Sequence, residues 1–155
     1  MDSDVNSAMM LASSYRAMGN AANMRHAAEV ALRRAEAVLA RDQNNSGVIA
    51  YSANALGALG ERERAKARMS RALLIDPGNW NMRYNFACTL ATYLGDKDAA
   101  LEMMQPLFEG ITEPLLRYLM DDPDFMALHD DPRYQSMVAA AEARLAASQP
   151  TAAPA

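Results

Sequence analysis

The sequence predicts an all-α fold, a solenoid of about three helix–turn–helix repeats followed by a helical cap at the C-terminus. The 155 residues are 51% hydrophobic but only 6% aromatic, and the apolar share is rich in Ala, which has the highest helix propensity and a small side chain. Two segments, 38–51 and 72–85, align at an offset of 34 residues, the period of helix–turn–helix repeats. Residues 132–146 carry one apolar stripe at helical spacing.

The length of the chain suits a single domain. We place this domain at residues 1–147 and expect residues 148–155, a short segment of small residues and Pro, to form a disordered tail. Within the domain the repeats are expected at about 4–44, 45–79 and 80–112, with capping helices at about 113–147.

The first repeat is indicated by Tyr15 and Gly19, which approach a turn before a long second helix. In the second repeat Gly60 marks the turn between the helices. Ala65 and Met69 are spaced four residues apart, and Pro77 follows Met69 by eight. Since Pro cannot continue a helix interior, this spacing predicts that the second helix ends just before residue 77.

The third repeat shows the same order of residues. Gly95 marks its turn, and Ala100 and Met104 repeat the four-residue spacing of its second helix. Pro114 then begins a short helix, since Pro is favoured in the first helical turn.

Two Asp-Asp-Pro sequences, at 121–123 and 130–132, divide the capping region. Asp before Pro favours a helix start, because the carboxylate accepts from free backbone N–H groups and Pro has none to leave unpaired. The last predicted helix carries its apolar residues at positions suited to covering the end of a repeat stack: Tyr134, Met137, Val138, Ala141 and Leu145.

Together these residues resemble the tetratricopeptide repeat family over roughly residues 4–110. The resemblance implies a right-handed solenoid whose Ala positions lie at close helix contacts. The Trp and Leu-Gly usual in the first helix of a repeat are absent from the middle unit, where Ile49, Ser52 and Ala53 stand. The two Asp-Asp-Pro motifs resemble the repeat region at the C-terminus of some bacterial multidomain proteins. In those proteins a class III adenylate cyclase domain or a DNA-binding regulatory domain precedes the repeats.

In this family the first helices of the repeats line a groove that binds extended or helical peptides. Asn side chains can bind a peptide backbone through both donor and acceptor, and Tyr offers apolar area with a polar tip. Lys and Asn form the family's carboxylate clamp, but Met9 and Ser13 stand at those positions, so an acidic peptide tail is not expected as ligand. Carried over position by position, the groove residues are Asn6, Met9, Ser13, Arg16, Ala50, Asn54, Asn81, Tyr84 and Cys88.

The residues give no indication of catalysis. Cys88 has no His or Lys nearby in the sequence to activate it, and one Cys excludes a disulfide scaffold. His26 and His129 lie on different elements without a third ligand at metal spacing. The acidic pairs lack the spacing of a calcium loop. We therefore expect no enzyme activity, metal or cofactor.

The formal net charge of −4 disfavours nucleic acid as partner. A basic stretch on the second helix of the middle repeat is expected to be a solvated outer face: Arg62, Arg64, Lys66, Arg68 and Arg71. No apolar run reaches the ~20 residues of a membrane span, and the acidic start of the chain does not resemble a signal peptide. We expect a cytoplasmic location and no membrane association.

These observations favour a non-catalytic interaction scaffold that binds a protein or peptide segment in the groove. The alternative is a regulatory or self-associating repeat module of a larger signalling protein, such as a nucleotide cyclase or a transcription regulator. Light scattering at several concentrations distinguishes the two.

Overall fold

The computed structural model describes residues 2–148, with side chains from Asp4 to Ser148. All the regular secondary structure in this part of the chain is helical, which confirms the predicted all-α class; the hand and the family of the repeat stay predictions. The predicted tail lies outside the described residues apart from Ser148. The elements are α1 Asp2–Ala17, α2 Ala21–Leu39, α3 Ser46–Ala58, α4 Arg62–Ile75, α5 Trp80–Thr92, α6 Lys97–Gly110, α7 Glu113–Asp121, the 3₁₀-helix η1 Pro123–Leu128 and α8 Pro132–Ala147.

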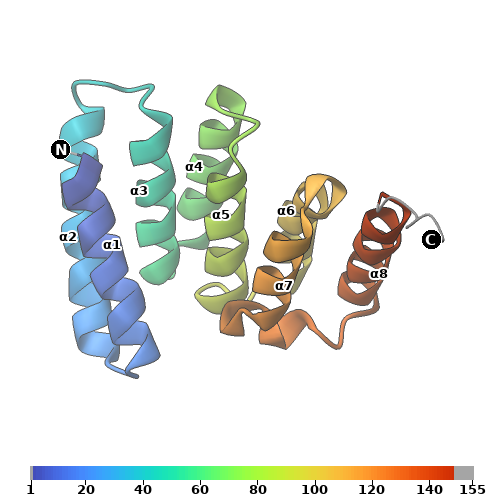
Figure 1. Cartoon of the computed structure of the whole chain (residues 1–155). Coiled ribbons are helices and arrows are strands. Elements are labelled where there is room, and N and C mark those ends of the chain that lie inside the picture. The colour runs from blue at the N-terminus through green and yellow to red at the C-terminus, as the bar shows by residue number, and fades with distance from the viewer. Residues whose placement is uncertain (1, 149–155) are drawn as a thin grey trace, which may run out of the picture.

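The first six helices form three neighbouring pairs, α1/α2, α3/α4 and α5/α6, that stand side by side from the N-terminus towards α8 (Figure 1). Helix α3 also packs against α1 on one side and α5 on the other. It is therefore buried along most of its length, including Val48, Ile49, Ala53 and Leu56. This central position explains why α3 is built almost wholly of small and apolar residues.

A Gly residue with a positive φ follows the first helix of each pair. Gly19, Gly60 and Gly95 have φ of 69°, 80° and 59°, a region that side chains with a Cβ rarely adopt. Asn45 and Asn79 begin α3 and α5 in the same way, by accepting a hydrogen bond from the backbone N–H three residues ahead, at 3.1 and 3.0 Å. These two caps are 34 residues apart.

Helices α3 and α5 approach unusually closely at Gly57. A Cβ added to Gly57 would lie 2.2 Å from Cγ2 of Thr89, a distance that Cβ atoms essentially never show. The absence of a side chain at residue 57 therefore sets the spacing between two helices that, together with α1, line the central cavity described below.

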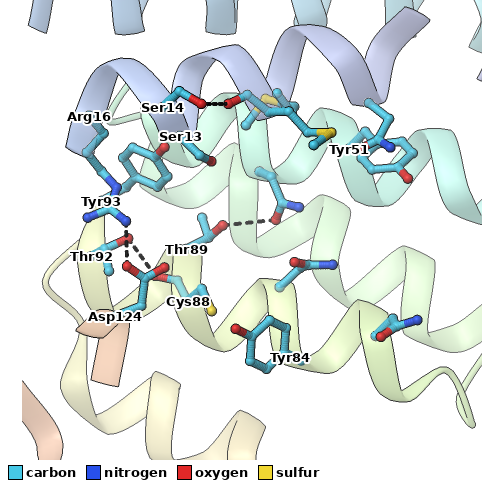
Figure 2. Close-up of a pocket in the computed structure, with 16 residues that line it drawn as sticks. Ser13, Ser14, Arg16, Tyr51, Tyr84, Cys88, Thr89, Thr92, Tyr93 and Asp124 are labelled. Atoms are coloured by element: carbon cyan, nitrogen blue, oxygen red, sulfur yellow. Dashed lines mark hydrogen bonds and ion pairs between the residues drawn. The ribbon is translucent and has the colours of Figure 1, made fainter. Parts of the chain in front are cut away.

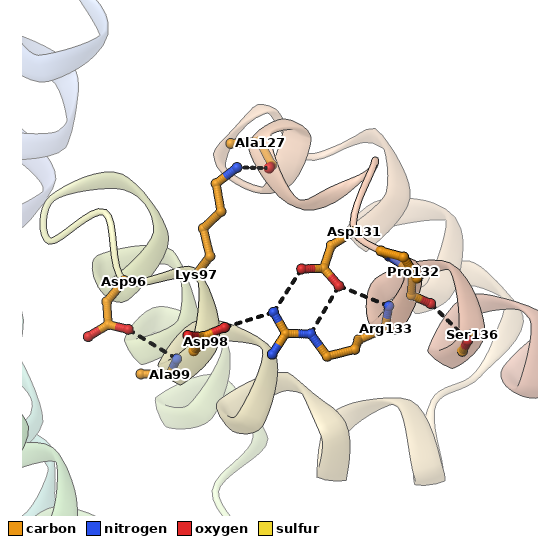
Figure 3. A network of polar contacts seen from close by, with 9 residues as sticks. All are labelled: Asp96, Lys97, Asp98, Ala99, Ala127, Asp131, Pro132, Arg133 and Ser136. Carbon is orange, nitrogen blue, oxygen red and sulfur yellow. Dashed lines mark hydrogen bonds and ion pairs between the residues drawn. The ribbon is translucent and has the colours of Figure 1, made fainter.

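Two elements of the cap begin with predicted Asp residues. Asp122 accepts from the backbone N–H of Asp124 at 2.9 Å and begins η1, and Asp131 accepts from the N–H of Arg133 at 2.9 Å and begins α8. The first of these elements is a short 3₁₀-helix rather than an α-helix. Arg133 also joins the start of α8 to the start of α6 through Asp98, at 2.8 Å (Figure 3).

The basic stretch on α4 is exposed at Arg62, Arg64 and Arg71, in line with the predicted solvated face, but most of its side chains also bind neighbouring elements. Arg62 and Lys66 both bind Asp96 at 2.7 Å, and Arg68 binds Glu36 at 3.0 Å. Arg71 donates to the backbone oxygen of Gln43 at 2.6 Å. These side chains are long enough to reach the neighbouring pairs, so they tie α4 to the elements before and after it; Arg64 pairs only locally, with Glu61.

Candidate binding cavity

A central cavity of about 590 Å³ lies between α1, α3 and α5, with one residue of η1 on its wall. Its lining is mainly polar and uncharged, with Arg16 and Asp124 as the charged residues among the described side chains. Eight of the nine residues carried over from the repeat family line it: Asn6, Met9, Ser13, Arg16, Asn54, Asn81, Tyr84 and Cys88.

Ala50 is the exception. The structure places it in the core, 8% exposed and outside the lining of the cavity. Because α3 is enclosed by its neighbours, the short side chain of Ala50 does not reach the cavity, whereas the next residue, Tyr51, does. Its assignment as a groove residue therefore needs correction to Tyr51.

The remaining lining residues were missed at the sequence level. Most lie one helical turn from, or beside, a predicted residue, so the spacing i to i+4 could have found Asn85 from Asn81 and Thr92 from Cys88. Asp124 carries no such signal, because it enters the cavity from the cap. The missed residues are Met10, Ser14, Tyr51, Asn85, Thr89, Thr92, Tyr93 and Asp124.

Asn54 is the most deeply buried amide of the cavity. It is 8% exposed, and its Oδ1 accepts a hydrogen bond from the hydroxyl of Thr89 at 3.0 Å. This bond joins α3 to α5 beside the close approach at Gly57. With Oδ1 occupied, the Nδ2 group has no partner among the described residues, so Asn54 offers the cavity a fixed hydrogen-bond donor.

One end of the cavity is closed by an ion pair. Nη2 of Arg16, on α1, lies 2.5 Å from Oδ1 of Asp124, on η1, and the guanidinium carbon is 5.4 Å from the centre of the Tyr93 ring. Burial lowers the pKa of Arg16, but the hydrogen bond and charge of Asp124, together with Tyr93, outweigh this and the net direction is upward. Arg16 is therefore a permanent cation held by two elements at this end of the cavity.

Tyr84 joins the cavity to the cap. Its hydroxyl donates to Asp122 and lies 3.1 Å from the hydroxyl of Tyr118, and its ring stacks on Trp80 at 5.5 Å and meets the edge of Phe125 at 5.8 Å. Burial, followed by the bond to Asp122, raises the pKa of Tyr84 far above its ordinary value of 10. Tyr84 therefore presents its ring to the cavity while its hydroxyl holds the cap.

Cys88 lines the cavity but is only 9% exposed. Burial raises the pKa of its thiol well above the ordinary value of 9, and the charges of Asp124 and Asp122 raise it further. The thiol is therefore protonated at neutral pH, and a protonated thiol is a poor nucleophile. Elsewhere in the described part of the chain, no group of three or more His, Cys, Asp or Glu side chains has the geometry of a metal site.

No family model matches the chain, and no curated protein matches it. The resemblance to tetratricopeptide repeats thus rests on the residues quoted above. Among residues 2–148, no helix is long and apolar enough to cross a membrane.

Proposed function

We propose that this protein is a non-catalytic scaffold of tetratricopeptide-like repeats, arranged as a right-handed solenoid, that binds a short peptide segment of a protein partner in the central cavity. The binding residues are the polar and aromatic side chains that α1, α3 and α5 present to it. The protonated thiol of Cys88 supports a role in binding rather than in catalysis.

The observation that carries this proposal is the set of unpaired amides around the cavity. Asn6, Asn81 and Asn85 line it, and their side chains make no hydrogen bond within the described residues. Each amide offers one acceptor and two donor hydrogens, which matches the alternating C=O and N–H groups of a peptide backbone. A surface of this kind binds an extended chain through its backbone and leaves side-chain preference to the ring of Tyr84 and to the Met residues.

The test uses random dodecapeptides displayed on phage and selected on the immobilised wild-type protein. A selected peptide is then synthesised with a fluorophore, and its affinity is measured by fluorescence anisotropy for the wild type and for the double variant Asn81→Ala, Asn85→Ala. Each lost hydrogen bond is worth about 0.5–1.5 kcal/mol, so the double variant should bind about 5- to 150-fold more weakly.

Asn23→Ala is the matched control, because Asn23 is exposed on α2 and lies outside the lining of the cavity. This variant should bind as the wild type does, and the circular dichroism of all three proteins should agree. Selection that enriches no peptide, or equal affinity of the double variant and the control, contradicts the proposal.

Self-association as a regulatory module is a second candidate, favoured by the last helix. Apolar cavities of about 430 and 360 Å³ flank α8, against α6 and α7, and Met137 and Val138 line them while staying partly exposed. The partner here is a second copy of the chain. Light scattering should then show mass rising with concentration, and Val138→Glu should abolish the rise; a monomer at every concentration contradicts this candidate.

A further inference from the structure

The central cavity is closed at one end and open at the other, and this asymmetry bears on which part of a peptide can enter it. Figure 2 shows Arg16, Thr92, Tyr93 and Asp124 gathered at one end and Tyr51 at the other. The ion pair of Arg16 and Asp124 joins α1 to η1 across the closed end. A chain that continued past this end would have to break that ion pair, so the closed end suits a chain terminus.

The charges at the closed end are unbalanced. Arg16 contributes one positive charge, already paired with Asp124. Asp122 adds a second carboxylate nearby, 9% exposed, which accepts from the hydroxyl of Tyr84 and the backbone N–H of Asp124. Asp122 lies outside the lining of the cavity, so the lining charges of Arg16 and Asp124 cancel and the extra negative charge acts from just beneath the wall. This negative charge acts on the thiol of Cys88: besides burial, the charges of Asp124 and Asp122 raise the pKa of the thiol.

A hydrogen-bond donor, Nδ2 of Asn54, lines the cavity about one helical turn from this end. Thr89, which fixes the amide of Asn54, is the neighbour of Cys88 on α5. The unpaired Nδ2 of Asn54 can donate to a ligand, and a peptide carbonyl oxygen is the acceptor that an extended chain supplies. A free peptide N-terminus offers both partners, because its positively charged ammonium group is followed closely by a carbonyl oxygen.

Resting on the proposed peptide-binding function, we infer that the closed end receives the free N-terminus of an extended peptide. The α-ammonium group lies against Asp124, and a carbonyl oxygen of the first residues accepts from Nδ2 of Asn54. A C-terminal carboxylate is disfavoured here, because Arg16 is already paired with Asp124 and the carboxylate of Asp122 lies next to Asp124.

The dimensions of the cavity suit a short ligand. Asn6 and Arg16, near the two ends, are ten residues apart on α1, a length of about 15 Å at 1.5 Å per residue. An extended peptide advances about 3.3 Å per residue, so the cavity holds about four or five residues. The chain leaves through the open end, past Asn81 and Asn85.

The test uses beads carrying random hexapeptides in three forms and the fluorescently labelled full chain. One set is linked through its C-terminus with a free amine, the second is the same set acetylated, and the third is linked through its N-terminus with a free carboxylate. The wild-type protein should be retained by the free-amine beads at least 10-fold more than by either other set.

The variant Asp124→Asn should lose this preference, while Asp130→Asn, an exposed Asp of the same cap, should keep it. Equal retention on the free-amine and acetylated beads overturns the inference and leaves the proposed function standing. Retention on no bead set overturns both. The comparison of free and acetylated beads uses only the wild-type protein, so it holds even where Asp124→Asn fails to fold.

Discussion

Arg16 and Asp124 are 108 residues apart in the sequence, yet their side chains form an ion pair at 2.5 Å. The first helix and the cap thereby meet across the central cavity. The cap is consequently part of the cavity as well as a cover for the end of the helix stack, and any change that moves η1 changes the shape of the cavity.

The coupling between these two residues can be measured by a double-mutant cycle in urea denaturation. Arg16→Ala, Asp124→Ala and the double variant should show a coupling free energy of about 1 kcal/mol, since both side chains are partly buried, 33% and 24% exposed. The pair Glu113 and Arg117 on α7 is more exposed, and its cycle should give only about 0.3–0.5 kcal/mol. Equal coupling in the two cycles would show that the pair at the cavity is an ordinary surface contact.

Gly57 sets the spacing of α3 and α5, and its replacement should disturb both. In Gly57→Ala the new methyl group collides with Cγ2 of Thr89, so the free energy of unfolding should fall by about 1–3 kcal/mol. Adding Thr89→Ser removes the methyl group that it meets and should recover most of the loss. Gly47→Ala, in the same helix but with only an ordinary contact at 3.6 Å, should stabilise by about 0.5–1 kcal/mol. A Gly57→Ala protein as stable as the wild type disproves the close approach.

Cys88 should react slowly in the folded protein. Its thiol is buried and has a raised pKa, so iodoacetamide at pH 8 should alkylate the native chain at least 10-fold more slowly than the chain in urea. Asp124→Asn removes one of the charges that raise this pKa and should speed the reaction, and Asp130→Asn is the control. Mass spectrometry measures the rates; a native rate equal to the unfolded one contradicts the burial of the thiol.

Asp131 should contribute stability that depends on acidity. Its side-chain and backbone hydrogen bonds from Arg133 lower its pKa from 3.8 to about 2. Because the folded state holds the proton less strongly than the unfolded chain, this contribution is full above pH 3.8 and is lost as pH falls towards 2.

Arg133→Gln should therefore raise the pKa of Asp131 towards 3.8, measured by NMR of the carboxyl carbon. The difference in urea midpoint between this variant and the wild type should shrink between pH 4 and pH 2. An unchanged pKa in the variant would show that Arg133 is not the cause of the shift.

Local features of this fold follow from the sequence because they depend on neighbouring residues. The left-handed Gly60, the capping by Asp122 and Asp131, and the helical phase that places Asn81 and Asn85 one turn apart on α5 all arise within one or two turns of helix. The spacing of apolar residues thus predicts which face of a helix points inward, and several candidate site residues, such as Asn54 and Cys88, lie at the edge of that buried face.

The features that escaped prediction depend on how distant elements meet. Asp124 reaches Arg16 only because η1 folds back over α5, and the reach of Arg68 to Glu36 depends on the spacing of two helix pairs. Ala50 was misplaced for a related reason, since a helix enclosed on several sides has little surface to offer. The spacing of residues along the sequence carries no information about how distant helices pack against one another.

The central claim is that the cavity between α1, α3 and α5 binds a peptide. Its most direct test is an NMR titration of the ¹⁵N-labelled protein with a synthetic peptide obtained by the phage selection, observing the side-chain amide signals of Asn residues. The signals of Asn54, Asn81 and Asn85 should shift and saturate together while that of Asn23 stays in place. Saturating binding that shifts signals on α8 and leaves these three unchanged would contradict the account.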